Sequence, residues 1–200
     1  MYRRPLDRDR ARFRRITQEA LVSHAPASAV YLVTGIQAAG KSTVAQALAE
    51  RLPRSAHVRG DVFRRFVVGG REDMSPDPSA EALEQLRLRH RMAARAADDY
   101  VREGFTAVIQ DVVLGEMLPY FVGRIRTDPL YVVVLAPRPE VVERREAGRA
   151  KNAYGIFTVA DLDTGLREST PRLGLWLDNS DLTVEETVDA ILERAEPIVR

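Results

Sequence analysis

One short segment of the sequence has the residue types and spacing needed to hold a phosphate chain. Residues 35–43 read GIQAAGKST, which is the P-loop pattern of two glycines followed by lysine and serine. Glycines permit a close backbone approach that a Cβ atom would block, so successive N–H groups can surround a phosphate. The lysine spans the terminal phosphates, and the serine hydroxyl binds Mg²⁺.

The pattern therefore predicts ATP and Mg²⁺ as cofactors. Lys41 is expected to be catalytic and Ser42 to be a metal ligand. The predicted nucleotide contacts are Gly35, Ala38, Ala39, Gly40, Lys41, Ser42 and Thr43.

Two aspartates follow predicted strands and are candidates for the chemistry beside this loop. Asp61 comes after a short strand at 56–58, and Asp111 comes after a strand at 105–110. The carboxyl ends of parallel strands form the ligand-binding edge of a sheet. Asp61 is predicted to be catalytic, because a carboxylate there can orient an acceptor hydroxyl or take its proton. Asp111 is predicted to contact Mg²⁺, its waters or the substrate.

Several arginines are placed where phosphate chemistry is expected. Arg64 lies about one helical turn after Asp61 and is predicted to bind substrate. A basic segment at about 138–157 is predicted to form a lid that neutralises the transferring phosphoryl group. Arg145 and Arg149 share a helix face and are its predicted catalytic residues. The simpler alternatives are an N-capping Asp61, a turn-capping Asp111 and solvated arginines.

Continuous apolar strands alternate with amphipathic helices along the chain. This pattern predicts an α/β three-layer P-loop NTPase fold, with a parallel sheet of about five strands and helices on both faces. Residues 1–27 are predicted to be a helical extension, and residues 28–200 the P-loop domain. The expected strands are 29–34, 56–58, 105–110, 130–135 and 173–177, and the main expected helices are 9–23, 42–51, 62–67, 79–103, 119–126, 139–149, 158–168 and 184–195.

The composition excludes several classes of protein. The 200 residues include 30 basic and 29 acidic side chains, so a generally basic nucleic-acid coat is disfavoured. The absence of cysteine excludes disulfides and thiolate metal sites. No apolar run approaches the length of a membrane span, and a cytoplasmic protein is expected. Arginine outnumbers lysine by 28 to two, and one of the two lysines is Lys41.

The remaining motifs favour a small kinase among P-loop proteins. The chain has no Asn-Lys-x-Asp segment for reading guanine and no Ser-Gly-Gly transporter signature. It resembles the small P-loop kinases that include chloramphenicol phosphotransferases and the kinase domain of polynucleotide 5′-kinases. The resemblance rests on GIQAAGKST, GDVF at 60–63, QDVVLG at 110–115, FVG at 121–123, residues 143–149 and the turn at 179–180, and with the polynucleotide kinases on Asp61-x-x-Arg64.

The resemblance implies that Asp61 is the base for the acceptor hydroxyl, and that Asn179 and Ser180 lie near the adenine. The expected function is phosphoryl transfer from ATP to a hydroxyl of a small molecule, such as an antibiotic or a metabolite. A polynucleotide or nucleotide kinase and a non-catalytic ATP-binding module are the alternatives. The segment 68–80, which should help to form the acceptor pocket, has no match in either group.

Overall fold

The protein is built on one parallel β-sheet. A computed structural model describes residues 28–148 and 157–199. The strands are β1 (Val30–Gly35), β2 (Ser55–Arg59), β3 (Thr106–Gln110), β4 (Leu130–Leu135) and β5 (Leu175–Leu177), in the order β2-β3-β1-β4-β5. Every neighbouring pair is parallel. The carboxyl ends of all five strands therefore lie at one edge of the sheet.

β1 is the central strand, and its composition explains its position. All six of its residues, VYLVTG, are buried, as expected for a strand covered on both faces. β3 and β4 flank it in register from Val30, which aligns with Ala107 on one side and Leu130 on the other. The loop that follows β1 therefore leaves the middle of the carboxyl edge.

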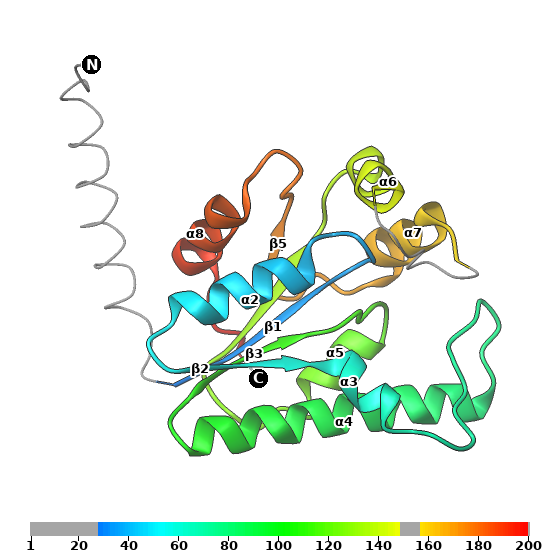
Figure 1. Cartoon of the computed structure of the whole chain (residues 1–200), viewed down its shortest axis with the longest axis horizontal. Coiled ribbons are helices and arrows are strands. Elements are labelled where there is room, and N and C mark those ends of the chain that lie inside the picture. Colours follow the sequence, from blue (N-terminus) through cyan, green and yellow to red (C-terminus); the bar gives the residue numbers. More distant parts are fainter. Residues whose placement is uncertain (1–27, 149–156, 200) are drawn as a thin grey trace.

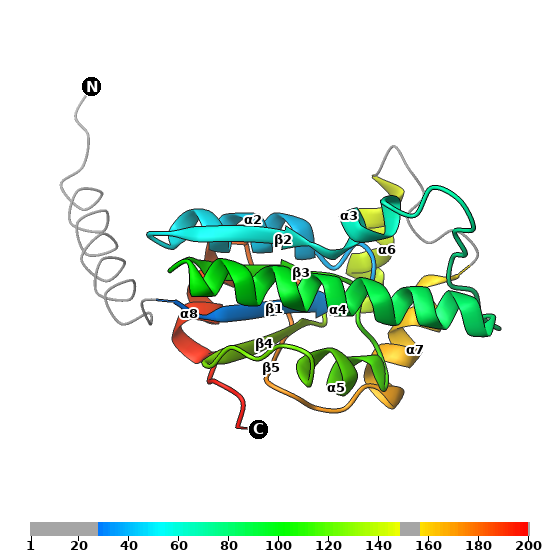
Figure 2. The ribbon, with the colours of Figure 1, turned by 90° about the horizontal axis from the view of Figure 1, so that it is seen from below.

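The helices form a layer on each face of the sheet (Figure 1). One layer holds α2 (Lys41–Arg51) and α8 (Val184–Arg194), and the other holds α4 (Ala80–Arg102) and α5 (Met117–Val122). Figure 2 shows α4 running along the full length of the sheet. The carboxyl edge carries the three remaining helices of the described structure, α3 (Gly60–Arg65), α6 (Pro139–Ala147) and α7 (Val159–Ser169).

The predicted fold class is confirmed, and the element boundaries differ at a few places. The strand expected at 130–135 has those bounds. β5 is shorter than expected because Gly174 has a φ of +68°, and a Cβ there would collide with the backbone of Val132. α5 ends before Gly123 rather than at 126. The helix predicted at 9–23 lies outside the described residues.

The last helix begins with a capping box. The Thr183 side chain accepts a hydrogen bond from the backbone of Glu186, whose side chain accepts one in return. Thr158 and Asp161 form the same arrangement at the start of α7. No helix in the described part of the chain is both long and apolar enough to cross a membrane.

Candidate functional site

The loop between β1 and α2 is curled by residues with left-handed torsions. Gly35 and Gly40 have φ values of +141° and +96°, and Ala38 has a φ of +57°. A Cβ at Gly35 would collide with the Leu135 carbonyl. Gly40 is also the N-cap of α2, so the loop ends at the positive end of that helix. This is the backbone cradle that the P-loop pattern predicts for an anion.

Lys41 and Ser42 begin α2. Lys41 is buried, and its Nζ donates a hydrogen bond of 2.7 Å to the Ile36 carbonyl across the loop. Ser42 is exposed, and its Oγ donates to Gln110 Oε1 at 3.2 Å. The loop thus carries a positioned ammonium group beside an exposed hydroxyl.

The donor set at Ser42 fits Mg²⁺ held mainly by phosphate and water. Among the described residues, no group of three or more His, Cys, Asp or Glu side chains could hold a metal ion alone. Mg²⁺ in kinases commonly takes one or two protein oxygens and completes its shell with phosphates and waters. The Ser42 hydroxyl and the Gln110 amide oxygen are suitable oxygens for that arrangement.

Asp111, the residue after Gln110, is buried in an ion pair. It is 1% exposed, and it pairs with Arg89, whose Nε donates to Asp111 Oδ2 at 2.7 Å. Its Oδ1 also accepts the backbone N–H of Val112 at 2.7 Å. A Cβ at Gly60 would collide with the Asp111 carboxylate. These contacts support a positioning role for the turn before Asp61, and the metal or substrate contact predicted for Asp111 stays a prediction.

Asp61 lies in the first turn of α3 and is held by two arginines. Arg59 is the N-cap residue, so the alternative of an N-capping Asp61 is wrong. Asp61 Oδ1 accepts from Arg64 Nε at 3.2 Å, and Oδ2 accepts from Arg65 Nε at 2.8 Å. Burial raises the pKa of Asp61, but Arg65 and Arg64 outweigh it and hold that pKa below its ordinary value. Asp61 is therefore ionised at neutral pH.

Arg64 links Asp61 to the segment that sequence analysis left unassigned. Its guanidinium also pairs with Asp73. Arg64 and Asp73 border a cavity of about 250 Å³ between α3, residues 66–74 and the first half of α4. Arg89 borders it too, and burial lowers the Arg89 pKa to about 10, which leaves the side chain charged at neutral pH. The apolar side chains of its wall are Phe63, Phe66, Val67, Met74, Ala82, Leu86, Leu88 and Met92.

One of the two predicted adenine-side residues, Asn179, lies against the P-loop. Asn179 is buried, and its Nδ2 donates to the Ala39 carbonyl at 3.1 Å. Arg145 Nη2 donates to the Asn179 carbonyl at 3.0 Å. The Asn179 Oδ1 atom is buried without a hydrogen-bond partner in the described structure, which leaves an acceptor beside the loop. Ser180 Oγ accepts from the Arg138 backbone at 2.8 Å.

The structure brings one of the two predicted lid arginines to the loop. Arg145 Nη1 lies 3.5 Å from the Ala39 carbonyl, and burial lowers its pKa. Arg149, the other predicted lid residue, lies outside the described residues, as does Lys151. Arg138 instead forms a two-pronged ion pair with Asp181, at 2.8 Å for each bond.

Three site residues were not found from the sequence. Gln110 contacts Ser42, whereas the sequence analysis predicted a metal or substrate contact for the neighbouring Asp111. Arg89 and Asp73 are joined to the site only by tertiary contacts. The position of Gln110 at the end of a predicted strand could have identified it, as it identified Asp111. No local sequence signal identifies Arg89 or Asp73.

Comparison with known proteins agrees with this geometry. Residues 30–168 match the family model AAA_33, described as an AAA domain. No curated protein matches the sequence significantly. The similar solved structures described next are 17–19% identical to this chain, so the likeness concerns the fold alone.

Three of these structures illustrate the range of relatives. A sugar kinase from Janibacter has a TM-score of 0.62 at 17% identity, covering 84% of this chain and 94% of its own. The Mycobacterium tuberculosis APS kinase CysC in complex with AMPPNP and APS has a TM-score of 0.61 at 19% identity, covering 84% and 97%. The Deinococcus radiodurans tunicamycin resistance protein has a TM-score of 0.58 at 18% identity, covering 86% and 99%.

Proposed function

The chain belongs to the AAA_33 family and has a P-loop kinase fold, and from this we propose that it transfers the γ-phosphate of ATP to a hydroxyl group of a small molecule. The observation that carries the proposal is the position of the 250 Å³ cavity. Asp61 is joined through Arg64 to the wall of that cavity. Asp61 also follows β2, at the edge of the sheet from which the P-loop leaves.

In the proposed reaction, the P-loop and Lys41 hold the phosphates, and Arg145 adds positive charge from the Ala39 side. Mg²⁺ on the Ser42 hydroxyl would neutralise phosphate charge when bound. The acceptor oxygen forms a bond to the γ-phosphorus, the bond from that phosphorus to the ADP oxygen breaks, and the hydroxyl proton passes to Asp61. Such transfers depend on positioning and electrostatics more than on a strong base, which agrees with the lowered pKa of Asp61.

The lining of the cavity favours an acceptor with an apolar body. Its wall is formed largely by phenylalanine, leucine, valine and methionine side chains, which bury carbon rather than hydroxyl groups. Its arginines are already paired with Asp61, Asp73 and Asp111. A 5′-hydroxyl polynucleotide needs free cations for its phosphates, so this pairing argues against the polynucleotide alternative.

A labelled-phosphate screen tests the proposal. The protein is incubated with [γ-³²P]ATP, Mg²⁺ and hydroxyl compounds of graded hydrophobicity, with sugars and a 5′-hydroxyl oligonucleotide in the same panel. We expect label on apolar hydroxyl compounds, and we expect Lys41→Ala to reduce kcat about 10²–10³-fold through loss of a charged phosphate contact. Arg194→Ala removes an exposed cation on α8 and should retain full activity.

Two results would contradict the proposal. Tight ATP binding without transfer to any compound would identify a non-catalytic binding module. Transfer only to the oligonucleotide, lost in Arg64→Ala, would identify a polynucleotide kinase.

A further inference from the structure

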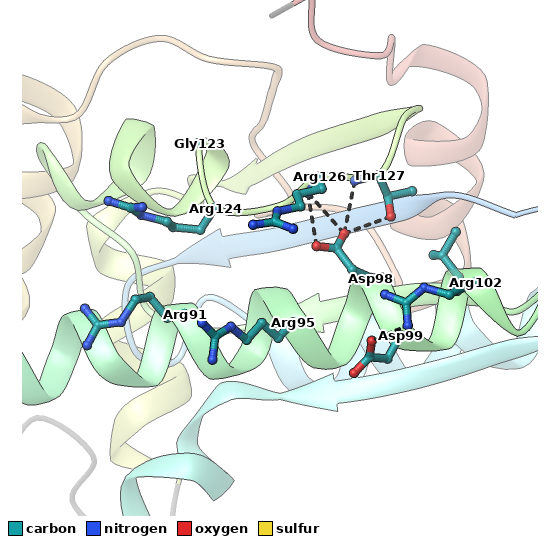
Figure 3. A pocket seen from close by; sticks show the side chains of 10 residues that line it. Arg91, Arg95, Asp98, Asp99, Arg102, Gly123, Arg124, Arg126 and Thr127 are labelled. Atoms are coloured by element: carbon teal, nitrogen blue, oxygen red, sulfur yellow. Dashed lines mark hydrogen bonds and ion pairs between the residues drawn. The ribbon is translucent and has the colours of Figure 1, made fainter.

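A second and larger hollow lies against the other half of α4. A groove of about 630 Å³ is lined by residues 91–102 of α4 and by residues 123–127, which connect α5 to β4. We call it the arginine groove, because five arginines from its two walls surround it (Figure 3). They are Arg91, Arg95, Arg102, Arg124 and Arg126.

The arginine groove is remote from the P-loop. Its two walls lead into β3 and β4, so they lie near the amino ends of the strands. The P-loop leaves the carboxyl end of β1, which runs in register between β3 and β4. A six-residue strand spans about 20 Å, so the two regions are separated by about that length. The groove is not a part of the acceptor pocket.

Most of the charge in the groove is not neutralised. Arg102 pairs with Asp99 at 2.8 Å. The other carboxylate, Asp98, accepts the backbone N–H groups of Arg126 and Thr127 at 3.1 and 3.0 Å rather than a guanidinium (Figure 3). Within the described ranges, no carboxylate lies within ion-pair distance of the four remaining arginines, Arg91, Arg95, Arg124 and Arg126.

The walls of the groove are held by specific contacts. Asp98 also accepts the Thr127 hydroxyl at 2.8 Å, so α4 and the segment 123–127 are tied together at the base of the groove. Arg91 Nη1 donates to the Tyr120 hydroxyl at 3.1 Å, and the Arg124 guanidinium lies 4.7 Å from the centre of the Tyr120 ring. These contacts position two guanidinium groups without neutralising their charge.

We propose that the arginine groove binds a small anion that carries two or more adjacent phosphate groups. The planar guanidinium fork matches phosphate oxygens, and cations on both walls can contact neighbouring phosphates together. The volume lies within the range of small-molecule pockets. None of the described residues that line the groove is aromatic, so they offer no platform on which the bases of a single-stranded nucleic acid could stack.

Residue-resolved arginine labelling tests the proposal. The protein is treated with phenylglyoxal, which modifies guanidinium groups, with and without inorganic tripolyphosphate at 0.15 M salt, and peptides are quantified by mass spectrometry. We expect tripolyphosphate to slow the labelling of Arg95 and Arg126 at least fivefold. Arg194, which is exposed and has no ion pair with any residue that the structure describes, is the internal control and should be labelled at an unchanged rate. Binding at the P-loop does not affect this readout, because each arginine is measured separately.

Matched variants supply a second measurement. In calorimetry, we expect the wild type to show two tripolyphosphate binding events, one at the P-loop and one in the arginine groove. Arg95→Ser with Arg126→Ser should weaken binding to the groove at least tenfold, so that one of the two events is lost. Arg87→Ser with Arg194→Ser removes the same charge from two positions that do not line the groove and should preserve both events. Both double variants change side chains that are at least partly exposed, so circular dichroism should report an intact fold in each.

Three outcomes would overturn the proposal. Labelling of Arg95 and Arg126 that is as fast with tripolyphosphate as without it would exclude an anion site. Equal protection by citrate would show that the groove responds to charge rather than to phosphate. Tighter binding of a single-stranded oligonucleotide than of tripolyphosphate at the same salt would assign the groove to nucleic acid.

Discussion

α4 forms a wall of two hollows that use arginine in opposite ways. Its first half borders the acceptor pocket, where Arg89 is paired with the buried Asp111 and Arg64 with Asp61 and Asp73. Its second half borders the arginine groove, where four arginines have no acidic partner in the described structure. A paired arginine fixes the direction of a carboxylate and holds a turn in place, whereas an unpaired arginine remains available to a ligand. Arginine therefore has a structural role in the acceptor pocket and a ligand-binding role in the arginine groove.

The largest expected difference between the two hollows is in stability. Arg89→Ala leaves the Asp111 carboxylate buried without its cation, and the loss of one partner of a buried ion pair costs about 3–5 kcal/mol. Arg95→Ala changes an exposed side chain, and we expect less than about 0.5 kcal/mol. Urea unfolding of the two variants and the wild type measures both values. Equal costs would contradict the distinction between the two kinds of arginine.

The next expected effect concerns the part of α4 shared by both hollows. His90 is fully buried and stacks on Phe121 with ring centroids 4.6 Å apart, and neither ring nitrogen has a hydrogen-bond partner in the described structure. Burial, with a smaller contribution from Arg89, lowers the pKa of His90 to about 3. Below its ordinary pKa, the unfolded chain binds a proton that the folded chain does not. Stability is therefore lost as pH falls from about 6.5 towards 3, by about 1.4 kcal/mol per unit.

Replacement of His90 isolates this contribution. Between pH 6.5 and 5, the wild type should lose about 2 kcal/mol relative to His90→Phe, measured by urea unfolding at each pH. Parallel pH curves for the two proteins would show that His90 is not buried in its neutral form.

A pair of glycines gives a smaller contrast. A Cβ at Gly60 would collide with the Asp111 carboxylate, so Gly60→Ala should cost about 1–3 kcal/mol through overpacking. A Cβ at Gly123, in the wall of the arginine groove, would lie 3.4 Å from the Pro119 carbonyl, and Gly123→Ala should change stability by less than about 0.5 kcal/mol. Thermal unfolding of both variants provides the comparison. A neutral Gly60→Ala would mean that Asp111 does not pack closely against the turn before Asp61.

The smallest expected effect is a change in the pH profile of transfer. Arg65 helps to hold the pKa of Asp61 below its ordinary value. Arg65→Ala should therefore move the acid limb of kcat to higher pH, because Asp61 must be ionised to orient the hydroxyl. Arg87→Ala changes a partly exposed arginine of α4 that pairs with Glu84 and not with Asp61; it is the control and should leave the profile unchanged. If the acid limb lies at the same pH in the wild type and both variants, the ionisation of Asp61 does not cause it.

The sequence predicted what local patterns encode. The P-loop needs glycines at defined positions, and the structure confirms their left-handed torsions. The buried strand at 130–135 is a continuous apolar run without a helical or alternating pattern of polar residues. The pairing of Arg89 with Asp111 was not predictable, because it joins residues 22 positions apart and depends on the packing of α4 against the sheet. Asp73 was missed because it pairs with Arg64 across the loop between α3 and α4, a contact that no local pattern encodes. Gln110 was missed because a carboxylate is the more usual neighbour of a metal.

The most direct test of the account is the rate of phosphoryl transfer in Asp61→Asn. This change keeps the shape of the side chain and removes the charge that Arg64 and Arg65 hold at the edge of the acceptor pocket. With a hydroxyl acceptor found in the screen, kcat should fall at least about 10²-fold, while the affinity for ATP measured by calorimetry stays within about twofold of the wild type. A fully active Asp61→Asn would contradict the assignment of Asp61 to the acceptor hydroxyl, and with it the proposed site of transfer.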